Sequence, residues 1–126
     1  MAIRVVLIED NDVFRQALEL LLSLRDEIEI VASEPDGTRA AELCAELSPD
    51  VVLVDYRLPE LDGVQVTRLV HERCPEVAIV VLTAAAGAGE IKAMREAGAV
   101  ACVRKDEPLD AIVEAVRAAA RPAESG

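Results

Sequence analysis

Hydrophobic and polar positions along this chain follow two patterns, one typical of buried strands and the other of amphipathic helices. Five short runs rich in Val, Ile and Leu are nearly continuous, which is the pattern of strands covered on both faces of a parallel sheet. The pattern predicts strands over residues 3–8, 28–33, 51–54, 77–82 and 100–104.

Between these runs the apolar residues recur at helical spacing and are bounded by helix start and stop signals. Asn11 can cap the first helix, Pro75 ends the third, and Gly98 suits the C-terminal cap of the fourth. Alternating strands and helices, joined by right-handed crossovers, predict one α/β domain with a doubly wound parallel sheet. The predicted helices cover residues 12–24, 38–48, 64–74 and 87–97, and a fifth begins at residue 108.

The first predicted helix carries more apolar residues than one buried face needs. Its core face follows the positions i, i+3, i+4, i+7 and i+8, which are Phe14, Ala17, Leu18, Leu21 and Leu22. A second apolar line, on a different face, consists of Val13, Leu20 and Leu24. This second line either wraps the edge of the sheet or contacts a partner.

Carboxylates stand directly after two of the predicted strands. Asp55 follows residues 51–54, and Glu9 and Asp10 follow residue 8. Because ligands of open α/β sheets bind at the carboxyl edge of the strands, we expect these three side chains to share one small volume. Hard oxygen ligands of this kind suit Mg²⁺, which takes one or two carboxylates and keeps several waters.

A hydroxyl group and a cation stand at the ends of two further strands. Thr83 follows residues 77–82, and Lys105 follows residues 100–104. A carboxylate nucleophile, a metal site, a hydroxyl donor and a fixed positive charge at one edge could together accept a phosphoryl group. The ordered set is a stronger signal than any one of these residues alone.

Four segments resemble the receiver domain of bacterial two-component response regulators: VVLIEDN, DVVLVDYRLPELDG, IVVLTA and EAGAVACVRKDE. The resemblance extends from residue 3 to about residue 121. Its style is most similar to receivers of the LuxR-type (NarL-like) DNA-binding regulators, which often read Lys-Asp after the last strand. It implies a flavodoxin-like fold with strand order 2-1-3-4-5 and five helices, and a signalling domain rather than an enzyme of small-molecule metabolism.

The resemblance also implies a role for each acidic residue at the sheet edge. Asp55 matches the aspartate that takes a phosphoryl group from a sensor histidine kinase. Asp10 and Asp55 match direct Mg²⁺ ligands, whereas Glu9 acts through a water molecule. The backbone carbonyl of Arg57 matches a further ligand.

The resemblance holds less well at the switch positions. Thr83, with Ala84 beside it, matches the switch hydroxyl, and Lys105 matches the phosphate-binding lysine. Three residues before that lysine the family usually has Tyr or Phe, but this chain has Cys102. The common coupling between the threonine and an inward-swinging aromatic ring therefore cannot operate in its usual form. We expect residues 84–97 to carry the conformational change by backbone movement instead.

Composition and charge restrict the partners of the domain. The net charge of −11 argues against nucleic-acid binding by this domain, because phosphate contacts need a basic surface. No apolar run reaches the roughly 18–20 residues of a membrane span. The N-terminus enters a strand directly and has no signal-peptide pattern. These features predict a cytoplasmic protein without membrane contact.

The expected domain organisation follows from the resemblance and from the composition of the tail. We interpret residues 1–121 as the receiver and residues 122–126 as the start of a linker. A helix-turn-helix output domain that regulates transcription is expected beyond it, and a stand-alone receiver is the alternative. LuxR-type relatives also suggest a homodimer through the first and last helices.

Two other functions are alternatives to phosphorylation-dependent signalling. A haloacid-dehalogenase-like phosphatase also uses a strand-end aspartate and Mg²⁺, but it needs a second aspartate where this chain has Arg57. A degenerate receiver would act as a protein-binding module independently of phosphorylation. Cys102 favours that interpretation, whereas the intact acidic residues argue against it.

Overall fold

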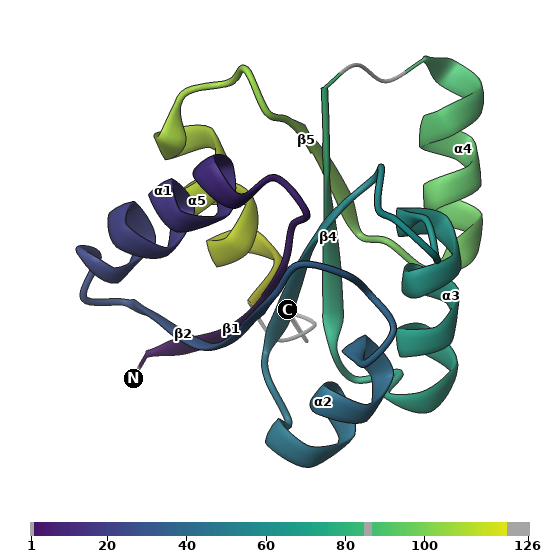
Figure 1. Ribbon diagram of the computed structural model, residues 1–126, viewed down its shortest axis with the longest axis horizontal. Coiled ribbons are helices and arrows are strands. Elements are labelled where there is room, and N and C mark those ends of the chain that lie inside the picture. The colour runs from purple at the N-terminus through teal and green to yellow at the C-terminus, as the bar shows by residue number, and fades with distance from the viewer. Residues whose placement is uncertain (1, 85–86, 121–126) are drawn as a thin grey trace, which may run out of the picture.

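The computed structural model describes residues 2–84 and 87–120, in which strands and helices alternate along the chain (Figure 1). The strands are β1 (Ile3–Ile8), β2 (Ile28–Glu34), β3 (Val51–Asp55), β4 (Ala78–Thr83) and β5 (Ala101–Arg104). The helices are α1 (Asp12–Ser23), α2 (Ala40–Leu47), α3 (Gly63–Arg73), α4 (Ala88–Ala97) and α5 (Leu109–Ala120). The linker expected over residues 122–126 lies outside the described residues.

The five strands form one parallel sheet in the order β2-β1-β3-β4-β5. This order confirms the expected doubly wound, flavodoxin-like topology. The chain reverses its direction of winding between β1 and β3, and ligands of such sheets bind outside the carboxyl ends of the strands at this point. The fold therefore places any site formed by the residues after β1 and β3 at the position where this architecture binds ligands.

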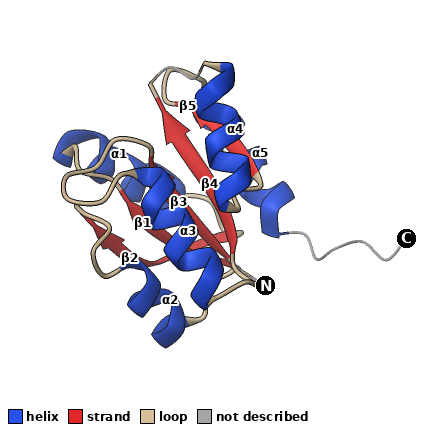
Figure 2. Cartoon of the chain, turned by 90° about the vertical axis from the view of Figure 1, so that its right-hand side faces the viewer, coloured by secondary structure: helices blue, strands red, loops and turns tan. Residues whose placement is uncertain are grey.

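The core has two layers, one on each face of the sheet (Figure 2). Helices α2, α3 and α4 cover one face, where buried strand residues such as Val54 and Ile79 belong to the same core cluster as Val66 and Met94. Helices α1 and α5 cover the other face, where Leu53 packs in the same cluster as the buried side chains of these two helices. Because the central strands β1, β3 and β4 are covered on both sides, their apolar residues run without alternation.

Several helix ends have the local chemistry that the sequence predicts. The side chain of Asn11 accepts a hydrogen bond from the amide of Phe14 and caps α1. Gly98 ends α4 with a φ of 121°, a value that favours glycine. Helix α2 starts at Ala40 rather than at Thr38, because the Asp36 carboxylate accepts hydrogen bonds from the amide and hydroxyl of Thr38 and holds this residue in a turn.

The core face of α1 is narrower than the periodicity predicts. Leu18 and Leu22 are buried, but Ala17 and Leu21 are exposed, so the prediction was wrong for these two residues. Arg15 lies beside these buried residues on α1, and its guanidinium donates a hydrogen bond to the Glu9 carbonyl oxygen, directly after β1. In the described part of the chain, no helix has the length and apolar character needed to cross a membrane.

Candidate functional site

The strand register brings the predicted site residues together at one edge of the sheet. Ile8 of β1 pairs with Val54 of β3, so the residues that follow them, Glu9 and Asp55, are neighbours across the two strands. Thr83 ends β4 and pairs with Arg104 of β5. Four strands thus deliver their end residues to a common region, as the sequence predicts.

Asp55 is the central carboxylate of this region and is only 3% exposed. Its Oδ1 accepts a hydrogen bond of 3.2 Å from the amide of Arg57, and its Oδ2 lies 3.1 Å from the Lys105 ammonium. The following loop folds back so that the amide of Gly63 donates to the Tyr56 carbonyl. A Cβ at Gly63 would lie 2.6 Å from the Asp55 carbonyl oxygen, so the loop requires glycine at this position.

Glu9 and Asp10 occupy the turn between β1 and α1. Glu9 is fully buried, and its Oε2 accepts hydrogen bonds from the amide of Asn11 and from the Lys105 ammonium, each at 3.0 Å. Asp10 is exposed. One oxygen from each of Glu9, Asp10 and Asp55 lies within 4.8 Å of the others. The structure thus brings together the three carboxylates that the sequence singles out.

Arg15 fastens this turn to α1. Its guanidinium donates a 2.8 Å hydrogen bond to the Glu9 carbonyl oxygen and forms an ion pair of 2.7 Å with Asp12. The same group approaches Glu19, whose carboxylate accepts a hydrogen bond from the Ser33 hydroxyl on β2. Because only 14% of the Arg15 side chain is exposed, these contacts hold the backbone that carries Glu9 and Asp10.

The electrostatics of the site favour an added positive charge. Burial and the neighbouring Glu9 charge raise the pKa of Asp55, although Lys105 partly offsets them. Desolvation and the Asp55 carboxyl group raise the pKa of Asp10. Burial by itself lowers the pKa of Lys105, but the hydrogen bonds and charges of Glu9 and Asp55 together outweigh it and raise that pKa.

A hard divalent cation fits this arrangement. The Oε1 atom of buried Glu9 has no hydrogen-bond partner within the described ranges, although the Lys105 ammonium lies 2.8 Å away. The single positive charge of Lys105 does not balance the three carboxylates of Glu9, Asp10 and Asp55, so a metal ion would offset the remaining negative charge. Glu9, Asp10 and Asp55 therefore offer oxygen atoms of the type that Mg²⁺ prefers, with room for water on the exposed side of Asp10.

Three further predicted residues, Thr83, Ala84 and Lys105, lie at the ends of β4 and β5. Thr83 is buried at the end of β4 and precedes the exposed Ala84. The amide of Lys105 donates a 2.8 Å hydrogen bond to the Thr83 carbonyl oxygen, which fixes the main chain from which the lysine side chain extends. The Lys105 ammonium also lies 4.9 Å from the centroid of the Phe14 ring, a contact that no pattern in the sequence indicates.

Cys102 lies on β5, away from the three carboxylates. It is half-buried, and burial raises the pKa of its thiol. It lines a hollow of about 390 Å³ together with Ile91, Arg104 and Glu107. The position where receivers usually carry an aromatic ring therefore opens to an unfilled surface hollow between α4 and α5.

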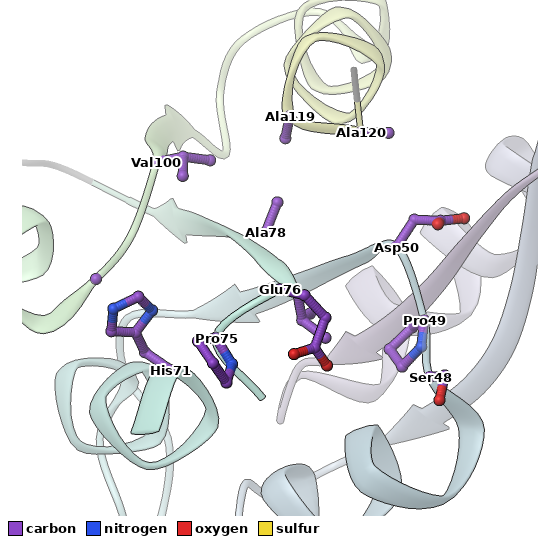
Figure 3. A pocket seen from close by; sticks show the side chains of 12 residues that line it. Ser48, Pro49, Asp50, His71, Pro75, Glu76, Ala78, Val100, Ala119 and Ala120 are labelled. Carbon is purple, nitrogen blue, oxygen red and sulfur yellow. The ribbon is translucent and has the colours of Figure 1, made fainter. Parts of the chain in front are cut away.

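A second hollow, of about 470 Å³, lies at the opposite edge of the sheet (Figure 3). His71, Asp50 and Glu76 line it, next to the end of α5 at Ala119. Asp50 is already engaged, because its carboxylate accepts a hydrogen bond from the Arg4 amide. We searched no further than residues 2–84 and 87–120 for sets of three or more His, Cys, Asp or Glu side chains that could bind one metal ion. Within these ranges, Glu9, Asp10 and Asp55 are the one such set.

Comparison with known proteins agrees with the fold and identifies the family of the chain. The family model for the response regulator receiver domain matches residues 5–117. The chain is 34% identical over 119 residues to the transcriptional regulatory protein DegU of Brevibacillus brevis, covering 94% of this chain and 50% of that protein. It is 37% identical over 114 residues to LnrK of Bacillus subtilis (strain 168), covering 90% of this chain and 52% of that protein.

A solved structure shows the same arrangement over the full domain. The signal receiver domain of the putative response regulator NarL from Mycobacterium tuberculosis superposes with a TM-score of 0.90 at 31% identity, covering 96% of this chain and 98% of that chain. The present chain spans about half the length of the curated relatives that it matches. It belongs to the response regulator receiver domain family, and its relatives are response regulators of the NarL and LuxR type.

Proposed function

We propose that Asp55 accepts a phosphoryl group from a sensor histidine kinase in a Mg²⁺-dependent reaction. The observation that carries this proposal is the position of the Lys105 ammonium, which lies 3.1 Å from Asp55 Oδ2 and 3.0 Å from Glu9 Oε2. An ammonium group held between the Asp55 and Glu9 carboxylates is placed to bind the oxygens of a phosphoryl group on Asp55. Membership of the receiver family supports the same chemistry.

The proposed transfer is a substitution at phosphorus. A carboxylate oxygen of Asp55 attacks the phosphorus atom of a phosphohistidine, the P–N bond breaks, and the imidazole nitrogen keeps the electron pair. The product is an acyl phosphate on Asp55. The signal ends by hydrolysis: water attacks phosphorus and the bond between phosphorus and the Asp55 oxygen breaks. This step restores the carboxylate and releases inorganic phosphate. The domain turns over no small-molecule metabolite in this scheme.

The metal has a defined set of candidate ligands. Asp10 and Asp55 would bind it directly, Glu9 would bind through water, and the Arg57 carbonyl would complete the protein ligands. Bound there, Mg²⁺ supplies positive charge that offsets the carboxylates and stabilises the phosphoryl oxygens. Lys105 adds a second, permanent positive charge, and Arg15 keeps the Glu9–Asp10 turn in place.

We propose that phosphorylation is transmitted through Thr83, Ala84 and α4. The small side chain of Cys102 provides no ring that could rotate behind Thr83, so movement of the main chain after β4 replaces the usual rotamer change. Gly89, in the first turn of α4, is exposed, and a Cβ there would meet no atom within 4 Å, so this side of the helix start faces solvent. Residues 85 and 86 of this segment lie outside the described residues.

The output is proposed to be transcription, through a helix-turn-helix domain following the receiver. The curated relatives are transcriptional regulators about twice as long as the present chain. The receiver's net charge of −11 supports a division in which a separate domain contacts DNA and this one does not. This proposal places the receiver in the cytoplasm, with a sensor histidine kinase as its upstream partner.

We also propose that the receiver forms a homodimer that uses α1. Val13, Leu20 and Leu24 are 79%, 64% and 70% exposed, and Leu21 is 40% exposed. The second apolar line predicted from the sequence therefore faces solvent and does not wrap the sheet edge. Exposed apolar groups gathered on one helix are typical of an interaction surface.

Intact mass spectrometry after incubation with acetyl phosphate and Mg²⁺ tests the proposed function. The wild-type chain should gain one phosphoryl group, whereas Asp55→Asn should gain none and EDTA should abolish the reaction. Asp50→Asn is a matched control, because Asp50 precedes the same strand at the other edge of the sheet. A wild-type chain that gains no phosphoryl mass would favour the degenerate, phosphorylation-independent binding module. Sustained release of phosphate from many donor molecules without a phosphoprotein would favour the phosphatase.

A further inference from the structure

The ammonium group of Lys105 lies against two carboxylates and one aromatic ring. Glu9 and Asp55 contact it through carboxylate oxygens, and the Phe14 ring lies beneath it with the nitrogen 4.9 Å from the ring centroid. A cation within about 6 Å of an aromatic centroid is attracted by the negative face of the ring. The lysine side chain is 21% exposed, so water screens this attraction only in part.

Contacts other than the lysine hold Phe14 at the start of α1. The Phe14 amide donates a 2.9 Å hydrogen bond to the Asn11 side chain, which caps the first turn of α1. The ring is partly buried and packs against the core cluster that contains Leu18 and Leu22. The ring therefore has packing partners of its own, apart from the ammonium group.

The two carboxylates around Lys105 change their charge or their ligands during the proposed reaction, whereas the ring does not. Asp55 changes its charge and its shape when it becomes an acyl phosphate, and Glu9 belongs to the proposed metal ligands. Phe14 takes part in neither event. We propose that Phe14 is a positioning residue for phosphoryl transfer, and that its ring holds the Lys105 ammonium beside Asp55. This inference rests on the proposed function, because it assigns a residue to that same reaction.

The composition of the chain permits a test that alters the ring electrostatics and little else. Phe14 is the one phenylalanine of the sequence, so phenylalanine analogues supplied during expression enter at this position alone. A series of mono-, di- and trifluorinated phenylalanines withdraws electron density from the ring face in steps and largely preserves its shape. The readout is the rate constant of Asp55 phosphorylation at saturating acetyl phosphate and Mg²⁺, measured by intact mass.

Loss of a partly exposed cation–π contact corresponds to an effect of about two- to fivefold. The rate constant should fall stepwise with the number of fluorine atoms and reach this factor in the trifluorinated protein. In a Lys105→Gln background, followed over longer times, the same series should leave the residual rate unchanged. Phe14→Tyr should keep the wild-type rate, whereas Phe14→Leu, which remains apolar, should show the full loss.

Nuclear magnetic resonance provides a second measurement that does not depend on the reaction. Lys92 and Lys105 are the two lysines of the sequence, and Lys92 is exposed on α4, where it pairs with Glu96. In protein labelled with ¹³C at the lysine ε-carbon, the ring current of Phe14 should displace the Lys105 signal upfield of the Lys92 signal. Phe14→Leu should remove the displacement, and the Lys92 signal serves as the internal control.

The outcomes separate this inference from the proposed function. A wild-type chain that is phosphorylated at the same rate with and without fluorine, or that has no upfield Lys105 signal, would overturn the role of Phe14 alone. Equal fluorine effects with and without Lys105 would also overturn it, because the ring would then act through packing. A wild-type chain that gains no phosphoryl group would overturn the proposed function and this inference together.

Discussion

The guanidinium group of Arg15 donates a 2.8 Å hydrogen bond to the carbonyl oxygen of Glu9 and so connects α1 to the turn that holds two of the proposed metal ligands. We expect Arg15→Lys to weaken Mg²⁺ binding by roughly tenfold, as loss of groups that orient metal ligands commonly does. Lysine keeps the positive charge but not the forked geometry, so the change reports positioning rather than charge. Isothermal titration with Mg²⁺ measures it.

The matched control for this prediction is Arg39→Lys. Arg39 also pairs with an acidic residue three positions away, Glu42, but both side chains are about half exposed and lie away from the site. Its replacement should leave the Mg²⁺ affinity unchanged. An Arg15→Lys protein that folds normally and binds Mg²⁺ as tightly as the wild type would contradict the role of Arg15.

Replacement of Asp55 by Asn should stabilise the metal-free protein at neutral pH. Burial and the Glu9 charge raise the pKa of Asp55 in the folded state, so its ionised form costs stability above the raised pKa, and this cost disappears as the pH falls. We expect a gain on the order of 1 kcal/mol in the free energy of unfolding at pH 7 in EDTA. Denaturant titrations at several pH values measure it.

The difference between Asp55→Asn and wild type should shrink as the pH falls toward the carboxyl pKa of the unfolded chain. Mg²⁺ should narrow the difference as well, because it stabilises the protein that still carries its ligand. An Asn variant that is less stable than wild type in EDTA at pH 7 would show that the Lys105 contact outweighs the repulsion from Glu9.

The loop after Asp55 should tolerate no side chain at Gly63. A Cβ there would lie 2.6 Å from the Asp55 carbonyl oxygen and 2.7 Å from the Tyr56 Cα, and backbone atoms cannot yield as a flexible side chain can. Gly63→Ala should therefore lower the free energy of unfolding by about 1–3 kcal/mol and slow phosphorylation. Gly89→Ala is the control, since a Cβ at that helical position meets nothing within 4 Å. The control should be neutral or more stable by up to about 1 kcal/mol.

Hydrogen exchange with and without beryllofluoride, a mimic of the phosphoryl group, tests the proposed switch. Protection should change over residues 84–97, because Cys102 leaves the main chain after Thr83 to respond by itself. Addition of fluoride without beryllium is the control. Changes confined to the peptides around Asp55, with unaltered exchange in α4, would remove the proposed route.

Self-association through α1 should depend on its exposed apolar residues. Leu20→Glu places a charge on a side chain that is 64% exposed in the single chain, so the fold should persist while the association weakens. Light scattering with and without phosphorylation measures the association state. Leu69→Glu is the matched control, because Leu69 is 45% exposed on α3, on the other face of the sheet. Equal association of wild type and Leu20→Glu in both states would contradict the dimer.

The sequence predicts the fold and the set of site residues because both depend on features that repeat along the chain. Continuous apolar runs mark the strands, and the residues directly after the runs must reach the same edge of a parallel sheet. Glu9, Asp55 and Thr83 are predicted in this way. Their mutual distances depend on strand register, which places Ile8 opposite Val54 and is not encoded in any single segment.

The parts that the sequence does not predict are contacts between side chains from distant elements. Phe14 fits the helical periodicity as an ordinary core residue, and nothing in that pattern indicates an ammonium group above its ring. From the sequence, Arg15 resembles a solvated helix residue, whereas in the structure its guanidinium donates a hydrogen bond to the Glu9 carbonyl oxygen. Spacing alone assigns Ala17 and Leu21 to the core, because it cannot tell how wide a stripe the sheet covers.

Helix α1 joins two properties that are usually considered separately. Its first turn carries Asn11, Phe14 and Arg15 against the acidic site, and its exposed side carries the apolar line that ends at Leu24. If phosphorylation favours association through this helix, thermodynamic reciprocity requires association to favour the phosphorylated form by the same factor. The concentration of the protein in the cell would then help to set how much of it is phosphorylated at a given kinase activity.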